Sequence, residues 1–376
     1  MPIKVCHITS VHDRHDKRII KMCNSLATAG YEVTLLCADN APDSIRDNLK
    51  IVSVKFHPKN RVQRIVSSRK VMLQAALEID ADIYHFHDPE LIPVGLQLKK
   101  NRKAIIYDSH EEYSLNILYK TWIPRLIRPL IGSIFRYYEN NAVRLFDSVI
   151  SVTPQIVNKF AKLNRHATLV TNYPLINSYL SEKRNAKNKI IKAEKKICYA
   201  GVIEPGRMHH IIVNAIERVP EAGYLLAGTG NKNYMAKLKK LPMWKNVTYL
   251  GELSFDEVLL MYERSVAGIV VENYGMLNYG KEGSLGVTKL FEYMSVGLPV
   301  ICTDFVLYRE IIAYYRCGIC VNPDDIDSIA KAISYILKHP AEARQMGENG
   351  KRAVLEKYNW GTQEKVLLDM YEKISN

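Results

Sequence analysis

The sequence lacks the long apolar runs that a membrane-spanning helix requires. No uninterrupted apolar stretch approaches the ~18 residues that such a span needs, so we expect no transmembrane segment. Low-complexity segments and repeats of solenoid length are also missing, which argues against disordered and solenoid architectures. The first four residues lead directly into an apolar segment, and we therefore expect no signal peptide.

Cysteine is present without a pairing pattern. The seven cysteines are scattered and odd in number, and several lie in apolar runs, where a free thiol packs as a small apolar group. This usage predicts a reducing, cytoplasmic location. Cys317 and Cys320 have the spacing of a redox or zinc pair, but no second pair accompanies them. We interpret both as packing residues.

Acidic residues are in deficit, with 39 Asp and Glu against 52 Lys and Arg, and the formal net charge is +13. This excess predicts attraction to a polyanion or to an anionic membrane. The basic residues are spread along the chain and no nucleic-acid-binding module is recognisable, so we expect no nucleic-acid partner. A membrane surface that carries a lipid-diphosphate acceptor explains the charge as well.

The length of 376 residues predicts two domains. In each half, short apolar segments typical of buried strands alternate with segments of helical periodicity, which predicts βαβ units and parallel sheets in an α/β fold. A basic stretch at residues 181–196 is interpreted as the linker between the halves. The predicted strands are residues 3–9, 31–38, 83–86, 104–107 and 148–152, then 197–201, 224–227, 247–250, 267–271, 300–302 and 318–321.

Residues 282–301 carry the most informative pattern. Small residues open a turn, a helical segment follows, and Gly297 and Pro299 end it before an apolar strand. Lys289 and Glu292 are three residues apart and project from one face of that helix. A helix start can receive an anion, a lysine can neutralise a phosphate, and a carboxylate can accept hydrogen bonds from sugar hydroxyls. The combination suits a sugar attached to a diphosphate.

This segment resembles the signature of retaining glycosyltransferases of family 4, which have the GT-B fold. Their usual pattern is a Glu, seven residues, a second Glu, and then Ala-Met-x-x-Gly-x-Pro-Val, and residues 292–300 match its second half. Eight residues before Glu292 the sequence has Ser284, and Glu282 lies two residues further back. A shorter family variant, in which a Lys precedes Phe-Glu-Tyr-Met, fits better and gives Lys289 a role.

The resemblance implies two Rossmann-like domains facing each other across a cleft, with a C-terminal helix crossing back to the first domain. The first, at residues 1–182 with about 360–376, would bind the acceptor, and the second, at residues 195–358, the nucleotide sugar. The implied reaction is a hexosyl transfer from a nucleotide diphosphate sugar, by default UDP-linked, to a hydroxyl of a glycan or lipid-linked glycan with retention of configuration. The implied setting is bacterial surface polysaccharide synthesis (O-antigen, capsule or exopolysaccharide), at the inner face of the cytoplasmic membrane.

Loops of the second domain are expected to hold the donor. Arg207 lies at the family's spacing from Gly201 and would stabilise the diphosphate together with Lys289, and Glu292 would bind the ribose. The alternative for Arg207 is a solvated side chain in a surface turn. The alternative for the Gly-x-Gly segment at residues 228–230 is a simple strand-to-helix turn. The resemblance implies a donor set of Gly201, Arg207, Gly228, Gly230, Tyr249, Leu250, Ser284, Lys289, Leu290 and Glu292.

The first domain offers a loop at the end of the strand at residues 104–107, where open α/β sheets bind ligands. His110 would hydrogen-bond a sugar hydroxyl, and Glu111 would hold the acceptor or tune His110. The alternative is that Asp108 or Ser109 caps a helix and the rest is solvated. The predicted catalytic set is His110, Glu111, Arg207, Lys289 and Glu282.

Acceptor contacts are assigned to His12, Arg18, His87 and Asp88. The loop after the first strand lacks the Gly-Gly pair that many relatives use for the donor diphosphate, so we assign it to the acceptor. The alternative interpretation of this loop is a capped helix start with Arg18 on the outer face of the helix. His85 and His87 share one face of a strand, a geometry open to a metal, but packing or acceptor contact is favoured. Because two cations can stabilise the diphosphate and no Asp-x-Asp run ends a strand, we expect a metal-independent reaction without a cofactor.

An amphipathic segment spans residues 122–136, and Pro129 weakens its helical character. We favour packing of its apolar face on the protein core, with docking in a membrane interface as the alternative. The apolar residues are Ile123, Leu126, Ile127, Leu130, Ile131 and Ile134, and opposite them lie Arg125, Arg128 and Arg136.

Two other functions are compatible with this sequence. A nucleotide-sugar epimerase or a pyridoxal-dependent sugar phosphorylase would keep the fold, and the epimerase would convert a UDP-sugar without an acceptor. A non-catalytic nucleotide-sugar-binding subunit would bind UDP but transfer no sugar.

Overall fold

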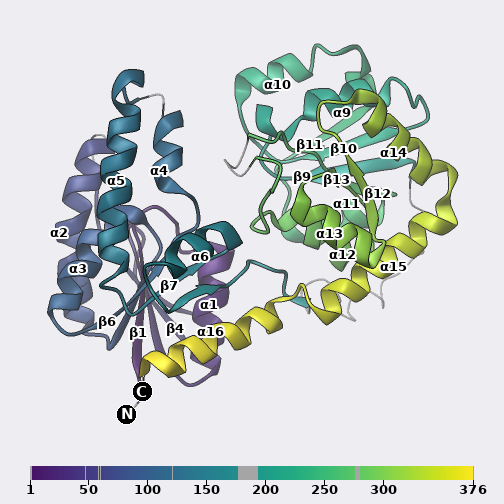
Figure 1. Ribbon diagram of the computed structural model, residues 1–376. Coiled ribbons are helices and arrows are strands. Elements are labelled where there is room, and N and C mark those ends of the chain that lie inside the picture. The colour runs from purple at the N-terminus through teal and green to yellow at the C-terminus, as the bar shows by residue number, and fades with distance from the viewer. Residues whose placement is uncertain are drawn as a thin grey trace. The chain divides into compact units, whose positions relative to one another are not determined.

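The computed structural model describes residues 2–46, 48–57, 59, 61–120, 122–176, 194–275 and 280–375. The chain divides into two compact units, residues 1–172 with 363–376 and residues 173–362. Each unit contains a largely parallel sheet flanked by helices (Figure 1). The predicted α/β fold with two Rossmann-like domains is confirmed.

The first sheet is parallel except for its edge pair β3–β4. Its strands run in the order β3 (Ser44–Arg46), β4 (Leu49–Ser53), β2 (Glu32–Cys37), β1 (Lys4–Thr9), β5 (Ile83–Phe86), β6 (Ala104–Asp108), β7 (Ser148–Ser151) and β8 (Ala167–Leu169). The strand order reverses beside β1, so β1 and β5 flank the point where open sheets bind ligands.

Helices cover both faces of the first sheet (Figure 1). Helices α2, α3 and α5 lie on one face, and α1 and α16 lie on the other. The helices of this unit are α1 (Lys17–Thr28), α2 (Arg61–Ile79), α3 (Ile92–Lys100), α4 (Tyr113–Asn116), α5 (Arg128–Val143), α6 (Pro154–Ala161) and α16 (Trp360–Ser375), with 3-10 turns η1 (Pro89–Leu91), η2 (Ile117–Tyr119) and η3 (Arg125–Ile127).

The second sheet is parallel throughout, in the order β11 (Val247–Gly251), β10 (Gly223–Ala227), β9 (Lys196–Ala200), β12 (Ala267–Val270), β13 (Val300–Thr303) and β14 (Gly318–Val321). Its strand order reverses between β9 and β12. The connecting elements are η4 (Pro205–Arg207), α9 (His209–Ile216), α10 (Lys232–Leu238), η5 (Pro242–Asn246), α11 (Phe255–Glu263), α12 (Thr288–Ser295), α13 (Val306–Tyr315), α14 (Ile326–Lys338) and α15 (Pro340–Glu356).

The second unit begins at Tyr173, ahead of the predicted domain boundary. The Tyr173 ring packs against Phe291 and Tyr358 in the second core, with ring centroids 4.7 and 5.5 Å away. The predicted end of the first domain at residue 182, and residues 181–193 of the predicted linker, lie outside the described residues. Lys196, placed in that linker, begins β9.

Helix α16 returns the chain to the first unit, as predicted. Leu367 and Tyr371 are fully buried there, and the Ser148 hydroxyl lies 3.0 Å from the Met370 sulfur. Within the described part of the chain, no helix has both the length and the apolar character to span a membrane.

Helix α5 and η3 leave most of the predicted apolar stripe exposed, which contradicts the favoured prediction of core packing, although Ile123 ahead of them is buried. Leu126 is 94% exposed and Leu130 is 62% exposed. The helix packs through other residues: a Cβ added at Gly132 would lie 2.8 Å from a backbone oxygen of α4, and buried Glu139 accepts a hydrogen bond from Tyr107. Because small and paired polar residues make this contact, the apolar stripe is left on the surface.

Candidate functional site

The two glycines after β10 allow two loops at the carboxyl edge of the second sheet to touch. A Cβ at Gly228 would lie 1.9 Å from the oxygen of Gly201, and one at Gly230 would lie 2.0 Å from the oxygen of Ile203. These distances are far below van der Waals contact, so only glycine fits. Packing within the protein therefore accounts for the Gly-x-Gly, as the alternative interpretation proposed, and its role toward a donor stays a prediction.

Arg207 lies in the loop after β9 and forms an ion pair with Glu272, which follows β12. The Glu272 side chain is 0% exposed and that of Arg207 is 19% exposed. Glu204 is a weaker neighbour, with its carboxylate 3.7 Å from Arg207 Nε. Strands β9 and β12 flank the reversal of strand order, so the pair occupies the position where ligands enter such sheets. The alternative of a solvated Arg207 in a surface turn does not hold.

Lys289 and Glu292 pair on the first turns of α12. Lys289 Nζ lies 3.0 and 2.8 Å from the two Glu292 carboxylate oxygens. The Thr288 hydroxyl donates to the same carboxylate at 2.8 Å, and the Tyr262 hydroxyl donates at 3.0 Å. Burial raises the pKa of Glu292, but Lys289 and the two hydroxyls outweigh it, and the pKa lies below its ordinary value. A ligand hydroxyl at Glu292 would join or displace these donors.

Tyr199 of β9 is buried and its hydroxyl bonds the start of the loop that carries Arg207. Burial raises the pKa of Tyr199 to about 12, with Arg207 acting to lower it and Glu292 acting to raise it. Its hydroxyl donates to the oxygen of Val202 at 3.1 Å. The loop after β9, which carries Arg207, and the start of α12, which carries Glu292, both follow strands of the second sheet at its carboxyl edge.

The predicted catalytic residue Glu282 and the remaining predicted donor residues have unequal access to solvent. Glu282 is exposed, whereas Ser284 is 3% exposed and its hydroxyl accepts a hydrogen bond from the N–H of Gly286 at 3.1 Å. The Leu290 side chain is fully buried in the core, which excludes a side-chain contact with a donor. Its backbone N–H lies in the first turn of α12, where an anion can still be received.

Tyr249 and Leu250, on the edge strand β11, are 37% and 39% exposed. The Tyr249 hydroxyl donates to the oxygen of Gly228 at 2.9 Å, which ties β11 to the glycine turn. Base binding by this backbone stays a prediction.

In the first unit, Asp108 at the end of β6 is held between two histidines. Its carboxylate lies 3.1 Å from His87 Nδ1 and 3.0 Å from His110 Nδ1. Burial raises the pKa of Asp108, but the nearby His110, Arg18 and His87 lower it more, and it lies well below its ordinary value. The carboxylate is therefore ionised, and it does not cap a helix as the alternative interpretation proposed.

His110 is flanked by Asp108 and by the Arg18 guanidinium, which contacts the imidazole ring. Burial, with the positive charge of Arg18, lowers the pKa of His110 to about 4, although Asp108 opposes this. His110 is therefore neutral near pH 7. Arg18 turns toward this site from α1, not outward as the alternative interpretation for its loop proposed.

Asp88 anchors the loop after β1, so its carboxylate is engaged within the protein. It accepts hydrogen bonds from the N–H groups of Ser10 and Val11 at 2.6 and 3.2 Å and from the Thr9 hydroxyl at 3.0 Å. His12, 30% exposed, lies 2.8 Å from Asp16 and 3.6 Å from Asp88. His12 thus keeps the access that an acceptor contact requires, whereas Asp88 positions the loop.

Two predictions for the first unit require correction. Glu111 does not tune His110, because its exposed carboxylate accepts a hydrogen bond from Asn116 at 2.5 Å and Asp108 occupies the position beside His110. His87 is fully buried, with one ring nitrogen 3.0 Å from His7 and the other 3.1 Å from Asp108, so no polar atom is left for an acceptor.

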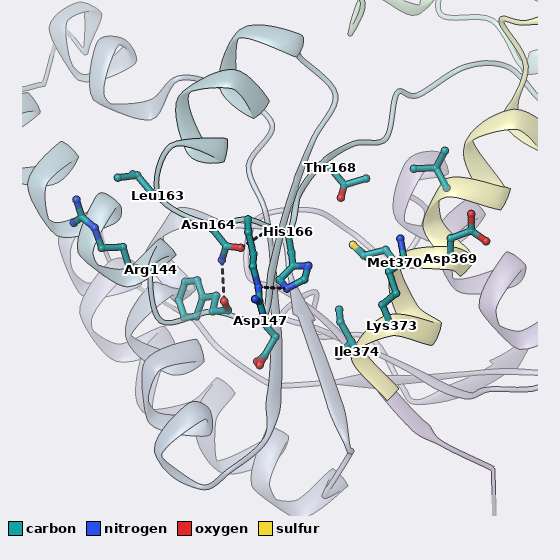
Figure 2. A pocket seen from close by; sticks show the side chains of 13 residues that line it. Arg144, Asp147, Leu163, Asn164, His166, Thr168, Asp369, Met370, Lys373 and Ile374 are labelled. Carbon is teal, nitrogen blue, oxygen red and sulfur yellow. Dashed lines mark hydrogen bonds between the residues drawn. The ribbon is translucent and has the colours of Figure 1, made fainter. Parts of the chain in front are cut away.

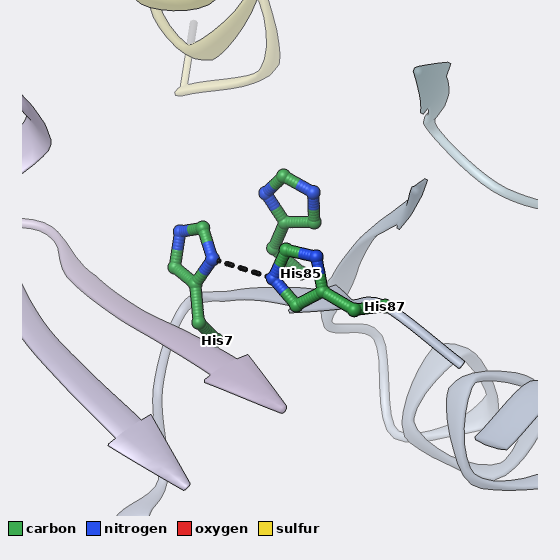
Figure 3. A group of neighbouring side chains, drawn as sticks. All are labelled: His7, His85 and His87. Carbon is green, nitrogen blue, oxygen red and sulfur yellow. Dashed lines mark hydrogen bonds between the residues drawn. The ribbon is translucent and has the colours of Figure 1, made fainter. Parts of the chain in front are cut away.

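Two groups of side chains could in principle hold a metal ion, namely His7, His85 and His87 (Figure 3), and His87, Asp108 and His110. The His85 and His87 rings are stacked, with centroids 4.7 Å apart and an angle of 20° between planes. Lone pairs of nearly parallel rings do not converge on one ion, which disfavours the first group. Arg18 against His110 disfavours a cation in the second.

A cavity of about 760 Å³ lies elsewhere in the first unit, between α16 and the amino-terminal ends of β7 and β8 (Figure 2). Its lining includes Arg165, His166, Asp369 and Lys373. The candidate residues occupy the carboxyl edge of the same sheet, so this cavity is not the candidate site.

Two family models match the chain, and together they reach from residue 17 to residue 353. "Glycosyltransferase Family 4" matches residues 17–173, and "Glycosyl transferases group 1" matches residues 181–353. The chain belongs to the GT-B-fold glycosyltransferases of the group 1 and family 4 type. The predicted family is thereby confirmed, while retention of configuration and the polysaccharide product stay predictions.

Two curated relatives of this chain align with about half of their own length. An uncharacterized glycosyltransferase of Methanocaldococcus jannaschii is 26% identical over 52% of this chain and 50% of its own. The O-antigen chain mannosyltransferase RfbU of Salmonella typhimurium is 25% identical over 55% of each chain. The chain thus spans about half the length of these curated relatives.

Solved structures resemble the chain over almost its whole length. Sucrose-phosphate synthase from Thermosynechococcus elongatus has a TM-score of 0.76 at 17% identity and covers 99% of both chains. Anabaena HepE, in complex with UDP and glucose, has a TM-score of 0.72 at 13% identity over 99% of this chain and 100% of its own. At these identities the likeness establishes the fold alone.

Sequence reasoning missed several residues of the site. Glu272 is a single acid after an apolar strand, and nothing in its neighbourhood marks it as the partner of Arg207. His7 and Tyr371 are separated by almost the whole chain, although the hydroxyl of Tyr371 lies 3.3 Å from His7 Nε2. A polar residue within an otherwise apolar strand, such as His7 in β1, was the available signal.

Proposed function

We propose that this protein transfers a hexosyl group from a nucleotide diphosphate sugar, UDP-linked by preference, to a hydroxyl group of a glycan or lipid-linked glycan, with retention of configuration. The observation that carries the proposal is the pair of charged clusters at the carboxyl edge of the second sheet, Arg207 with Glu272 and Lys289 with Glu292. The departing diphosphate gains negative charge as the glycosidic bond breaks, and preorganised cations stabilise that charge.

The start of α12 supports this role for Lys289. Val287, the residue before the helix, provides no side-chain cap among the described residues, and the first backbone N–H groups have no partner within the helix. An anion placed there meets these N–H groups and the Lys289 ammonium together. A diphosphate would compete with Glu292 for Lys289 and free Glu292 to bind the ribose hydroxyls.

His110 is proposed to face the sugar or the incoming acceptor, with His12 and Arg18 nearby. Because protein cations stabilise the leaving group in this scheme, we propose a metal-independent reaction, and the initial rate should be unchanged by excess EDTA.

Related proteins support the choice of ligands. HepE is in complex with UDP and glucose, and RfbU is an O-antigen chain mannosyltransferase. We therefore propose a UDP-sugar donor and a place in bacterial surface polysaccharide assembly, at the cytoplasmic face of the membrane.

The exposed stripe on η3 and α5 supports a membrane-bound acceptor. Leu126, Leu130 and Ile134 are 94%, 62% and 60% exposed, and the exposed Arg125 and Arg136 accompany them. Apolar side chains beside arginines fit the interface of an anionic bilayer. We propose that this stripe docks the protein on the surface that carries a lipid-linked acceptor.

The test starts from binding and ends at turnover. A thermal-shift panel of nucleotides and nucleotide sugars identifies the donor, because a ligand that binds only the folded state raises the melting temperature. Sugar transfer from that donor to a pool of lipid-linked glycans is then measured for Lys289→Ala, with the exposed Lys331→Ala as the control. Turnover should be lost in the first variant and kept in the second, and equal turnover in both would refute the proposal.

A further inference from the structure

The Glu292 carboxylate is held by protein donors on both of its oxygens. Oε1 accepts hydrogen bonds from the Thr288 hydroxyl at 2.8 Å and from Lys289 Nζ at 3.0 Å. Oε2 accepts hydrogen bonds from the Tyr262 hydroxyl at 3.0 Å and from Lys289 Nζ at 2.8 Å. A carboxylate offers about four lone-pair positions, two on each oxygen, so these contacts occupy all of them.

Tyr262 is a fixed donor to this carboxylate. The residue lies on α11 and is 0% exposed, and its ring packs edge-on against the Tyr293 ring of α12 with centroids 5.2 Å apart. Burial and the Glu292 charge raise the pKa of Tyr262 well above its ordinary value. The hydroxyl therefore keeps its proton and donates it to the ionised carboxylate.

Lys289 differs from Tyr262 because its side chain reaches solvent. It is 21% exposed, and its flexible stem allows the ammonium to turn toward an anion. A diphosphate at the start of α12 would attract it. Its departure would vacate one lone-pair position on each oxygen of Glu292, while Thr288 and Tyr262 keep the other two.

Two vacated positions, one on each oxygen, match the two neighbouring hydroxyl groups of a ribose. Each ribose hydroxyl would replace one contact of the ammonium, so the carboxylate would stay fully hydrogen-bonded. A 2′-deoxyribose has one hydroxyl fewer and would leave a charged, largely buried oxygen without one of its donors. An acceptor left unpaired in this way weakens binding.

We infer that Tyr262 and Thr288 are positioning residues that fix the Glu292 carboxylate to accept both hydroxyls of a ribose, so that the site selects ribonucleoside diphosphates over their 2′-deoxy counterparts. This inference rests on the proposed function, in which Glu292 binds the ribose of the donor. Because Tyr262 is fully buried, it acts on the ligand only through Glu292.

The test is calorimetric titration of the full chain with UDP and with 2′-deoxy-UDP, which differ by one hydroxyl. In the wild type the 2′-deoxy compound should bind roughly 10- to 100-fold more weakly, the range for one lost hydrogen bond to a charged group. Equal affinities of the wild type for the two nucleotides would overturn the inference.

The decisive variant is Tyr262→Phe, which keeps the ring and removes the hydroxyl. Glu292 can then follow Lys289 toward the diphosphate, so UDP should bind about tenfold more weakly and 2′-deoxy-UDP should change less. A general loss of packing would weaken both nucleotides by the same factor. A ratio of the two affinities that equals the wild-type ratio would therefore refute a positioning role for Tyr262.

The matched control is Tyr224→Phe. Tyr224 is also 0% exposed in the second unit, but its hydroxyl lies 2.9 Å from His209 Nδ1 and does not contact Glu292. This variant should keep the wild-type ratio between the two nucleotides, and a fall as large as in Tyr262→Phe would contradict the inference.

A second variant applies if Tyr262→Phe does not fold. Thr288 is only partly buried, and Thr288→Val removes the hydroxyl that donates to Oε1 while keeping the side-chain shape. The same fall in the affinity ratio is expected, and an unchanged ratio would refute the scheme.

Sugar transfer is measured separately, so the two proposals can fail independently. A wild type that prefers UDP over 2′-deoxy-UDP but transfers no sugar contradicts the proposed function and keeps this inference. A wild type that transfers sugar but binds the two nucleotides equally does the reverse.

Discussion

Removing Arg207 should destabilise the second unit as well as its binding site. In Arg207→Ala the Glu272 carboxylate, 0% exposed, loses the opposite charge beside it. Breaking one side of a buried pair costs about 3–5 kcal/mol, and the 19% exposure of Arg207 favours the lower end. For a unit of this size each kcal/mol lowers the melting temperature by about 2–4 °C, so we expect a fall of roughly 6–12 °C.

The matched variant is Arg207→Ala combined with Glu272→Gln. The amide has the shape of the carboxylate without its charge, so most of the lost melting temperature should return. Glu272→Gln alone should cost less than Arg207→Ala, because Arg207 can reach water and Glu272 cannot.

Calorimetry on the four proteins measures these differences, and a thermal shift with UDP measures binding in parallel. UDP binding should stay weak in the double variant even though its stability returns, because the cation is still missing. If Arg207→Ala melts within about 2 °C of the wild type, the pair is not closed and buried as described. If the double variant binds UDP normally, Arg207 does not contact the diphosphate.

Three further predictions address other features. Gly230→Ala places a Cβ 2.0 Å from a backbone oxygen and should lower stability by about 1–3 kcal/mol, whereas Gly275→Ala, with its nearest neighbour at 3.8 Å, should be neutral in thermal unfolding. The His110 pKa of about 4 means that between pH 6.5 and 4 the unfolded chain binds a proton that the native chain does not, so the free energy of unfolding falls as the pH falls. From pH 7.5 to 5 the wild type should therefore lose about 2 kcal/mol more than His110→Gln in urea titrations. Equal losses in the two proteins would contradict a neutral His110. Combining Leu126→Ser with Leu130→Ser should abolish flotation with anionic vesicles at an unchanged melting temperature, and undiminished flotation would remove the docking surface.

The parallel strands were predictable because their apolar runs leave little choice. Residues 83–86 and 318–321 form strands with the predicted bounds. The short strands β3, β4 and β8 were missed. Neither β3, which is exposed throughout, nor β8, which is only half-buried, contains an apolar run. The order of strands depends on crossover connections, which periodicity does not encode.

The site was predictable where one motif contains it. Lys289 and Glu292 pair as expected from their spacing, because both lie on one helical turn. The orientation of α5 was not predictable, because an apolar stripe is equally consistent with a core and with a membrane. A helix cap at Asp108 stayed open as the alternative interpretation because its partner His87 follows another strand, β5.

The first unit is built from both ends of the chain. Its core includes Leu367 and Tyr371 of α16, which are synthesised after the second unit, whereas the second unit is one continuous segment. During translation the second unit can therefore close before the first is complete, the reverse of the usual order. A nascent chain that stops before residue 363 would release a folded second unit beside a first unit whose histidines at β1 and β5 still face water.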